Sequence, residues 1–213
     1  MIAAIILSAG ASSRMGQPKA LLRLRSTSFL EAVLSACEAA GLSRKVVVLG
    51  PDGDKIMSEL DLEHLTVVRN PDPTTGPIGS IRLAVREVLN HPVEGVLIWH
   101  VDQPHVALDT IAVLLDRFRE GGHSIVVPEY RGMRGHPVVY GRAVFEELLH
   151  APDTDGARAV VRADPNRVTA VAVDDPAVRE DVDTPDAYRR LLRRLERADA
   201  SPPPREYPGS SSA

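Results

Sequence analysis

The distribution of apolar residues along the chain predicts an alternation of strands and helices. Four short runs rich in Ile, Leu and Val have the pattern of strands that are covered on both faces: residues 2–7, 46–49, 65–68 and 96–101. Between these runs, apolar residues recur at helical spacing over residues 29–37 and 81–89. This order is typical of right-handed crossover units in an open parallel sheet.

The second half of the chain continues the alternation with shorter elements. We expect a helix over 109–120, a strand over 124–127, a loop over 131–135, a strand over 136–140, helices over 144–149 and 157–163, and a strand over 168–173. Asp155 is expected to cap the helix at 157–163. Thr184 is expected to cap a final helix, which has Pro185 at its first position and runs to about Arg197.

These elements predict a single α/β domain over residues 1–197, with an open, mostly parallel sheet and helices on both faces. Its 213 residues and apolar fraction of 44% fit one such domain. Residues 198–213, which contain a run of three prolines and a run of three serines, are expected to form a disordered tail. Ligands of such sheets bind beyond the carboxyl ends of the strands.

Charge and cysteine content narrow the classes of partner. A net charge of −4 gives no overall positive field, so nucleic acid is not an expected partner. A single cysteine, Cys37, suits a reducing cytoplasm and cannot supply a zinc-ligand cluster. No run approaches the roughly 18 apolar residues of a membrane span. We therefore expect a cytoplasmic protein without a membrane partner.

The most informative segment is LSAGASSRMGQPK at residues 7–19, directly after the first predicted strand. Its small residues let a ligand approach the backbone, and Arg14 and Lys19 add positive charge, which together suit a nucleoside triphosphate. A Walker loop is excluded because Gly10 and Gly16 are separated by five residues and Gln17 follows. The G-x-G-x-x-G dinucleotide pattern is also absent.

This segment resembles the signature L-A-[AG]-G-x-S-x-R-M-G-x-x-K of the molybdenum cofactor cytidylyltransferases and related guanylyltransferases. The matching residues are Leu7, Gly10, Ser12, Arg14, Met15, Gly16 and Lys19, whereas Ser8 replaces the usual Ala. The resemblance extends to about Arg197 and implies the Rossmann-related fold of nucleotide-diphospho-sugar transferases. It also implies that the nucleotide is bound by Leu7, Ser8, Ala9, Gly10, Ser12, Arg14, Lys19, Asn70, Gly79 and Ser80.

By the same resemblance, Arg14 stabilises the β- and γ-phosphates and Lys19 the α-phosphate. Asp102 in the motif V-D-Q-P at 101–104 is the implied ligand of Mg²⁺, with Mn²⁺ as an alternative ion. The late motif D-V-D-T-P at 181–185 supplies the second ligand, Asp183, or less plausibly Asp181. The residues implied to lie on the side of the acceptor substrate are Gln103, His136 and Asp155.

Each of these residues also has a purely structural interpretation. Asp102 followed closely by proline can simply form a turn, and Asp181 or Asp183 can satisfy backbone donors before a helix. His100 is more plausibly a packed histidine than a ligand. Asp52 is expected to be exposed to solvent.

The resemblance implies transfer of CMP from CTP to a phosphate monoester, with release of pyrophosphate. The expected acceptor is molybdopterin bearing molybdenum, and a molybdenum hydroxylase would receive the product. The methyl group of Ala9, where guanylyltransferases have Gly, favours CTP, whereas G-P-I-G at 76–79 resembles the GTP-dependent branch. The alternatives are a GTP-dependent molybdenum cofactor guanylyltransferase, another cytidylyltransferase, a non-catalytic cofactor-delivery protein and a nicotinamide-dependent oxidoreductase.

Overall fold

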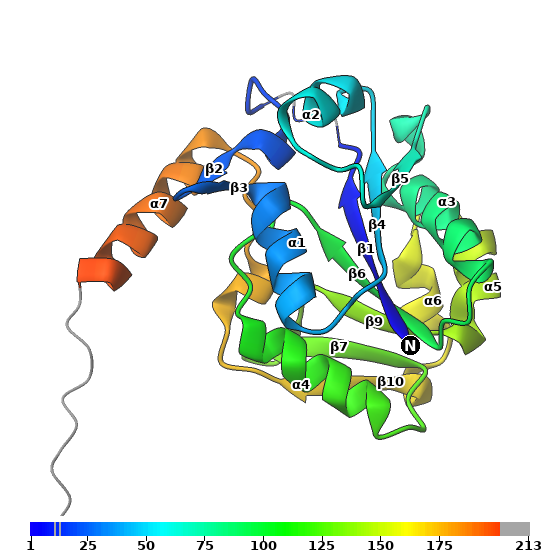
Figure 1. The fold of residues 1–213 in the computed structure, drawn as a ribbon. Helices are drawn as coiled ribbons and strands as arrows, with labels where there is room; N and C mark the ends of the chain where they lie inside the picture. Colours follow the sequence, from blue (N-terminus) through cyan, green and yellow to red (C-terminus); the bar gives the residue numbers. More distant parts are fainter. Residues whose placement is uncertain (11, 13, 201–213) are drawn as a thin grey trace, which may run out of the picture.

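The computed structural model of the chain describes residues 1–10, 12 and 14–200. A central sheet has the strand order β10-β7-β9-β6-β1-β4-β5, and β8 pairs with β7 (Figure 1). The strands are β1 (Ile2–Ser8), β4 (Lys45–Leu49), β5 (Thr66–Arg69), β6 (Gly95–His100), β7 (Ile125–Tyr130), β8 (Met133–Arg134), β9 (Val138–Gly141) and β10 (Val168–Ala172). A separate hairpin joins β2 (Arg23–Leu24) to β3 (Thr27–Ser28).

The predicted mostly parallel sheet is confirmed. Strand β1 lies between β4 and β6 and is parallel to both, and β5 and β10 are parallel to their neighbours β4 and β7. Two strands are exceptions: β9 runs antiparallel to β6 on one side and β7 on the other, and the short strand β8 runs antiparallel to β7. Every residue of β1 is buried, which explains why the amino-terminal strand is a continuous apolar run.

Helices cover both faces of the sheet, as expected (Figure 1). Because successive strand residues point to opposite faces, Ile5 and Ile6 of β1 belong to different core clusters. The cluster around Ile6 includes residues of α1 (Phe29–Ala39), α4 (Leu108–Arg119) and α7 (Pro185–Ala200). The cluster around Ile5 includes residues of α3 (Pro77–Leu89), α5 (Phe145–His150) and α6 (Ala157–Ala163).

Local capping explains where several helices begin. Ser28 and Glu31 form a capping box at the start of α1. The predicted cap of α7 is confirmed, because the Thr184 hydroxyl accepts a hydrogen bond of 3.2 Å from the Ala187 amide. The predicted cap of α6 by Asp155 is wrong. Gly156, with a φ of 57°, occupies the cap position, and no side chain caps the helix.

Other differences from the predicted elements are small. Helix α2 (Gly53–Glu59) was not predicted, since Ile56 is its only buried apolar side chain. The predicted loop at 131–135 contains the short strand β8, and α7 continues to Ala200. Residues 201–213 of the predicted tail lie outside the described residues. In the described part of the chain, no helix is long and apolar enough to cross a membrane.

Candidate active site

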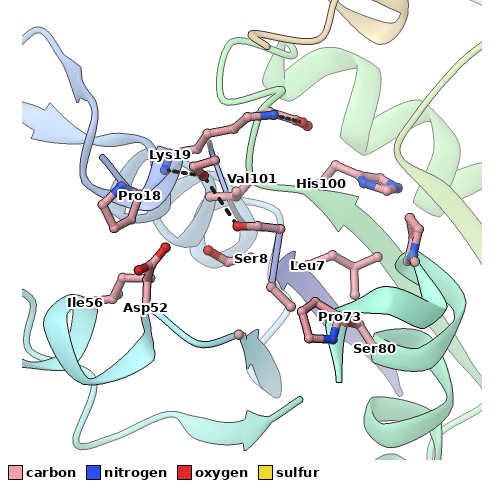
Figure 2. A pocket seen from close by; sticks show the side chains of 17 residues that line it. Leu7, Ser8, Pro18, Lys19, Asp52, Ile56, Pro73, Ser80, His100 and Val101 are labelled. Carbon is pink, nitrogen blue, oxygen red and sulfur yellow. Dashed lines mark hydrogen bonds and ion pairs between the residues drawn. The ribbon is translucent and has the colours of Figure 1, made fainter. Parts of the chain in front are cut away.

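The carboxyl ends of β1, β4 and β6 border a cavity of about 220 Å³ (Figure 2). This is the edge at which ligands of open α/β sheets bind. Its lining residues are Leu7, Ser8, Ala9, Gly10, Ser12, Pro18, Lys19, Gly50, Asp52, Ile56, Pro73, Gly76, Pro77, Ser80, His100, Val101 and Asp102. We call this space the nucleotide cavity.

The loop after β1 is folded tightly against the cavity. Ser12 and Gly16 have φ values of 44° and 70°, so the chain turns sharply at both positions. The Ser12 hydroxyl accepts a hydrogen bond of 3.1 Å from the Lys19 amide, which ties the loop to the start of the following helical turn. At Gly50, an added Cβ would lie 2.4 Å from the Ala9 carbonyl oxygen. The close approach of β4 to this loop therefore requires glycine at position 50.

Lys19 connects the loop to the two aspartates predicted as metal ligands. Its ammonium group is 2.8 Å from Asp102 Oδ2 and also donates a hydrogen bond to Asp183 Oδ1. The Lys19 and Asp102 side chains are only 16% and 19% exposed. Burial would lower the pKa of Lys19, but the two carboxylates outweigh it, so that this pKa lies above its usual value. Lys19 is therefore held firmly as a cation.

Asp181 adds a third carboxylate near the ion pairs of Lys19. Burial and electrostatic repulsion from Asp102 and Asp183 raise the pKa of Asp181 above its usual value. Asp102 Oδ1 is buried and has no hydrogen-bond partner among the described atoms. The cluster thus has more negative than positive charge and an unused carboxylate oxygen.

This arrangement fits a divalent cation that is held partly by its substrate. No group of three or more His, Cys, Asp or Glu side chains within the described residues has the arrangement of a metal site. Mg²⁺ is commonly held by one or two carboxylates together with phosphate oxygens and waters, so a complete protein cage is not needed. Asp102 and Asp183 supply two carboxylates, one with a free buried oxygen.

A second, larger cavity of about 760 Å³ adjoins the first, since Pro77 and His100 line both. Its other lining residues are Ile78, Ile81, Ile98, Val127, Arg134, Gly135, His136, Val138, Tyr140, Asp153, Thr154, Asp155, Gly156, Ala157, Arg158, Val161, Arg162, Val178, Arg179 and Asp181. We call it the acceptor cavity. It has room for a molecule larger than a nucleoside.

Two histidines mark the junction of the cavities. The rings of His100 and His136 meet edge to face, with centroids 4.8 Å apart. Burial lowers the pKa of His136 to about 3 and also lowers the pKa of His100, so both rings are neutral at pH 7. Neutral imidazoles can donate or accept hydrogen bonds toward a bound substrate.

Most of the residues predicted to bind nucleotide lie together. Leu7, Ser8, Ala9, Gly10, Ser12, Lys19 and Ser80 all line the nucleotide cavity, as does Asp102, which was predicted as a metal ligand. Three others do not line it. Arg14 is exposed, Gly79 is packed against Thr75, and the buried Asn70 donates a hydrogen bond of 2.9 Å to the Ser80 hydroxyl. Asn70 thus supports Ser80, and its Oδ1 accepts a hydrogen bond of 3.0 Å from the Asp72 amide.

The residues predicted on the acceptor side are divided. His136 and Asp155 line the acceptor cavity, whereas Gln103 is 1% exposed and lines neither cavity. The Gln103 amide nitrogen donates a hydrogen bond of 2.9 Å to Asp181 Oδ1. The same nitrogen also donates a hydrogen bond of 3.4 Å to the Val178 carbonyl oxygen, so Gln103 contacts the cavity through Asp181 and Val178.

Sequence reasoning missed several lining residues, of which Asp52 is the most informative. We expected Asp52 at the solvent, but it is half-buried and lines the nucleotide cavity beside Ile56 (Figure 2). A usable signal was present, because Asp52 closely follows the strand predicted at 46–49 and carboxyl ends of parallel strands form ligand sites.

Comparison with known proteins finds relatives that match almost the whole chain. The chain is 31% identical over 200 residues to nicotine blue oxidoreductase of Paenarthrobacter nicotinovorans. The alignment covers 90% of this chain and 96% of that protein. It is 25% identical over 186 residues to molybdenum cofactor cytidylyltransferase of Escherichia coli K12, covering 86% and 92% of the two chains.

Among solved structures, Rv0371c of Mycobacterium tuberculosis superposes with a TM-score of 0.82 at 34% identity, covering 91% of this chain and 98% of that one. A structure of Rv0371c in complex with manganese matches with a TM-score of 0.76 at 32% identity, covering 90% and 97% of the two chains. The model of the family described as "MobA-like NTP transferase domain" matches residues 4–168. With its first loop, sheet order and paired aspartates, the chain belongs to the MobA-like NTP transferase family.

Proposed function

We propose that the protein transfers CMP from CTP to a phosphate monoester acceptor, the molybdenum cofactor, and releases pyrophosphate. The observation that carries this proposal is that two cavities meet next to Lys19, whose ammonium group contacts two carboxylates. A donor and an acceptor that are both anionic must meet where positive charge is available. The named activity of the Escherichia coli relative supports the choice of substrates.

The residues of the chain have separate roles in this reaction. The amides and small side chains of the first loop bind the triphosphate, and Lys19 neutralises charge on the α-phosphate as the acceptor attacks. Arg14, which is exposed on the same loop, is proposed to turn toward the β- and γ-phosphates. His136 and Asp155 orient the acceptor from the larger cavity.

Asp102 and Asp183 would hold Mg²⁺ or Mn²⁺, and the manganese complex of the Mycobacterium tuberculosis relative supports such an ion. When bound, the ion would neutralise charge on the phosphates. Asp102 Oδ1 is available for this purpose without breaking an existing hydrogen bond. Asp183 would have to release Lys19 in part, which frees the lysine to contact phosphate.

The proposal is tested by measuring pyrophosphate release with Mg²⁺, molybdenum cofactor and either CTP or GTP. We expect turnover with CTP and a loss of at least roughly 100-fold for Asp102→Asn. Asp54→Asn, an equal charge change at an exposed position outside both cavities, should leave turnover unchanged. Preference for GTP would identify a guanylyltransferase, and nucleotide binding without pyrophosphate release would identify a delivery protein.

A second candidate is favoured by the 31% identity to nicotine blue oxidoreductase. In this alternative, the two cavities would hold a reduced nicotinamide cofactor and an organic acceptor. The discriminating assay follows the absorbance of NADH or NADPH with nicotine blue as the electron acceptor. Oxidation of the cofactor without pyrophosphate release under the conditions above would replace the transferase proposal.

A further inference from the structure

Asp52 is an unpaired carboxylate in the nucleotide cavity. It occupies the cap position of α2, where an aspartate commonly accepts a hydrogen bond from the helix, yet its side chain makes no such bond. Within the described residues, its carboxylate has neither a hydrogen-bond donor nor a cation as partner, although the residue is half-buried. This acceptor is therefore available to a ligand.

The strand order separates Asp52 from the cationic part of the cavity. Asp102 follows β6, the first loop follows β1, and Asp52 follows β4, so β1 lies between the two aspartates. Two neighbouring strand spacings of about 4.8 Å place the ends of β6 and β4 roughly 10 Å apart. Figure 2 shows Asp52 on the side of the cavity away from His100.

The surroundings of Asp52 suit a base better than phosphates. The cations of the site lie near Asp102, where Lys19 contacts two carboxylates that would also hold the proposed divalent ion. A triphosphate would be drawn to these cations and repelled by the unpaired carboxylate of Asp52. Near Asp52, the cavity is lined by Pro18 and by Ile56, which is 1% exposed (Figure 2). Apolar side chains of this kind can cover the face of a base while Asp52 reaches its edge.

A carboxylate reads the edge of a base by accepting hydrogen bonds only. Cytosine presents an amino group at position 4, which donates, whereas uracil has a carbonyl oxygen there, which would face the carboxylate as a second acceptor. Aspartate and glutamate are known acceptors for the cytosine amino group in nucleic-acid recognition. Asp52 thus provides a physical reason to prefer cytosine over uracil.

We propose that Asp52 is a specificity-determining residue that accepts a hydrogen bond from the amino group of the base and thereby selects CTP over UTP. The inference rests on the proposed function, because it concerns the nucleotide of the same site. It adds a residue that reads the base to the residues that hold the phosphates.

The test compares binding of CTP and of UTP to the full chain by calorimetry, with Mg²⁺ and without acceptor. An asparagine amide can donate to a carbonyl oxygen as well as accept, so Asp52→Asn should bind UTP better and CTP worse. We expect the ratio of CTP to UTP affinity to fall roughly tenfold or more, the effect of one hydrogen bond to a charged group. Asp52→Ala should lower CTP affinity and raise UTP affinity less than Asp52→Asn does, because it removes the opposing acceptor without adding a donor.

Asp54→Asn is the matched control, since it makes the same charge change on the same helix. Asp54 is exposed, forms an ion pair with Arg69 and does not line the nucleotide cavity. This variant should keep the wild-type ratio. A thermal melt of each variant checks that the fold is retained.

An unchanged CTP to UTP ratio in Asp52→Asn would overturn the assignment, as would equal losses for both nucleotides, which would indicate a contact with ribose. If the ratio changes as expected but no pyrophosphate is released with acceptor, the transferase proposal fails and the assignment of Asp52 is supported. If pyrophosphate is released but the ratio is unchanged, only the assignment fails. Absence of binding by either nucleotide overturns both.

Discussion

Replacement of Lys19 by methionine tests the electrostatic centre of the site. Methionine keeps the apolar length of the side chain but removes the cation that bridges Asp102 and Asp183. Asp102 and Asp183 then lose their shared ammonium partner, while the repulsion between them and Asp181 remains. We expect the metal-free protein to lose stability.

The magnitude follows from distance and burial. At 2.8 Å, the attraction between Lys19 and Asp102 is roughly 6 kcal/mol at an effective dielectric constant of about 20, and desolvation of the pair offsets much of it. Loss of one partner from a buried pair costs about 3–5 kcal/mol, and the partial exposure here reduces this to about 2–3 kcal/mol. The pair with Asp183, whose side chain is 42% exposed, adds at most about 1 kcal/mol.

The assay is urea and thermal unfolding in EDTA and in Mn²⁺. A total loss of about 3 kcal/mol corresponds to a fall in Tm of about 6–12 °C for a domain of this size. Mn²⁺ should raise the Tm of Lys19→Met more than that of the wild type, because the ion no longer competes with the ammonium group for the carboxylates.

Lys55→Met is the control, because Lys55 is exposed on α2 and lines neither cavity. It should change stability by less than about 0.5 kcal/mol. If Lys19→Met is no less stable than this control, Lys19 does not neutralise the aspartates. An equal effect of Mn²⁺ on Lys19→Met and the wild type would show that lysine and metal do not share them.

Three further predictions concern other parts of the structure. Burial lowers the pKa of His136 to about 3, so below about pH 6.5 this side chain binds a proton in the unfolded chain but not in the folded protein. The free energy of unfolding should therefore decrease by about 1.4 kcal/mol for each unit that the pH falls from 6 to 4. Urea titrations of His136→Gln should show a shallower pH dependence. Burial raises the pKa of the Cys37 thiol to about 12, so a disulfide reagent should modify it only when urea unfolds the protein, and rapid labelling of the native protein would contradict its burial. Gly50→Ala should push the first loop away from β4, because its Cβ would lie 2.4 Å from the Ala9 carbonyl oxygen; a CTP titration should show weaker binding, and unchanged affinity would mean that the loop can shift without consequence.

Much of the fold was predictable because its signals are local. The apolar runs that became β1, β4 and β6 identify buried strands, and their alternation with helices limits the topology to a mostly parallel sheet. The cap of α7 at Thr184 was also predictable, since a cap depends on neighbouring residues. Asp155 shows the limit of this reasoning, because Gly156 could adopt the positive φ that the helix start required.

The first loop was recognisable from the chain alone, since its residues are consecutive and each type suits contact with phosphate. Contacts between segments that are far apart in the sequence could not be predicted in this way. Lys19 and Asp183 are 164 positions apart in the sequence, yet one donates a hydrogen bond to the other. Whether two such residues meet depends on strand order and side-chain direction, which no local pattern encodes.

The direction in which each side chain points, toward or away from a cavity, was decided by the tertiary structure. Gln103 turns inward to hold Asp181, and Asp52, a polar residue in a short charged segment, turns toward the nucleotide cavity. Both choices arise from packing: β6 and β4 end on either side of β1, and the turns that follow them must fit against the first loop. Local sequence therefore sets the elements and the phosphate loop, whereas the contacts between distant segments set the charge balance and the shape that a substrate meets.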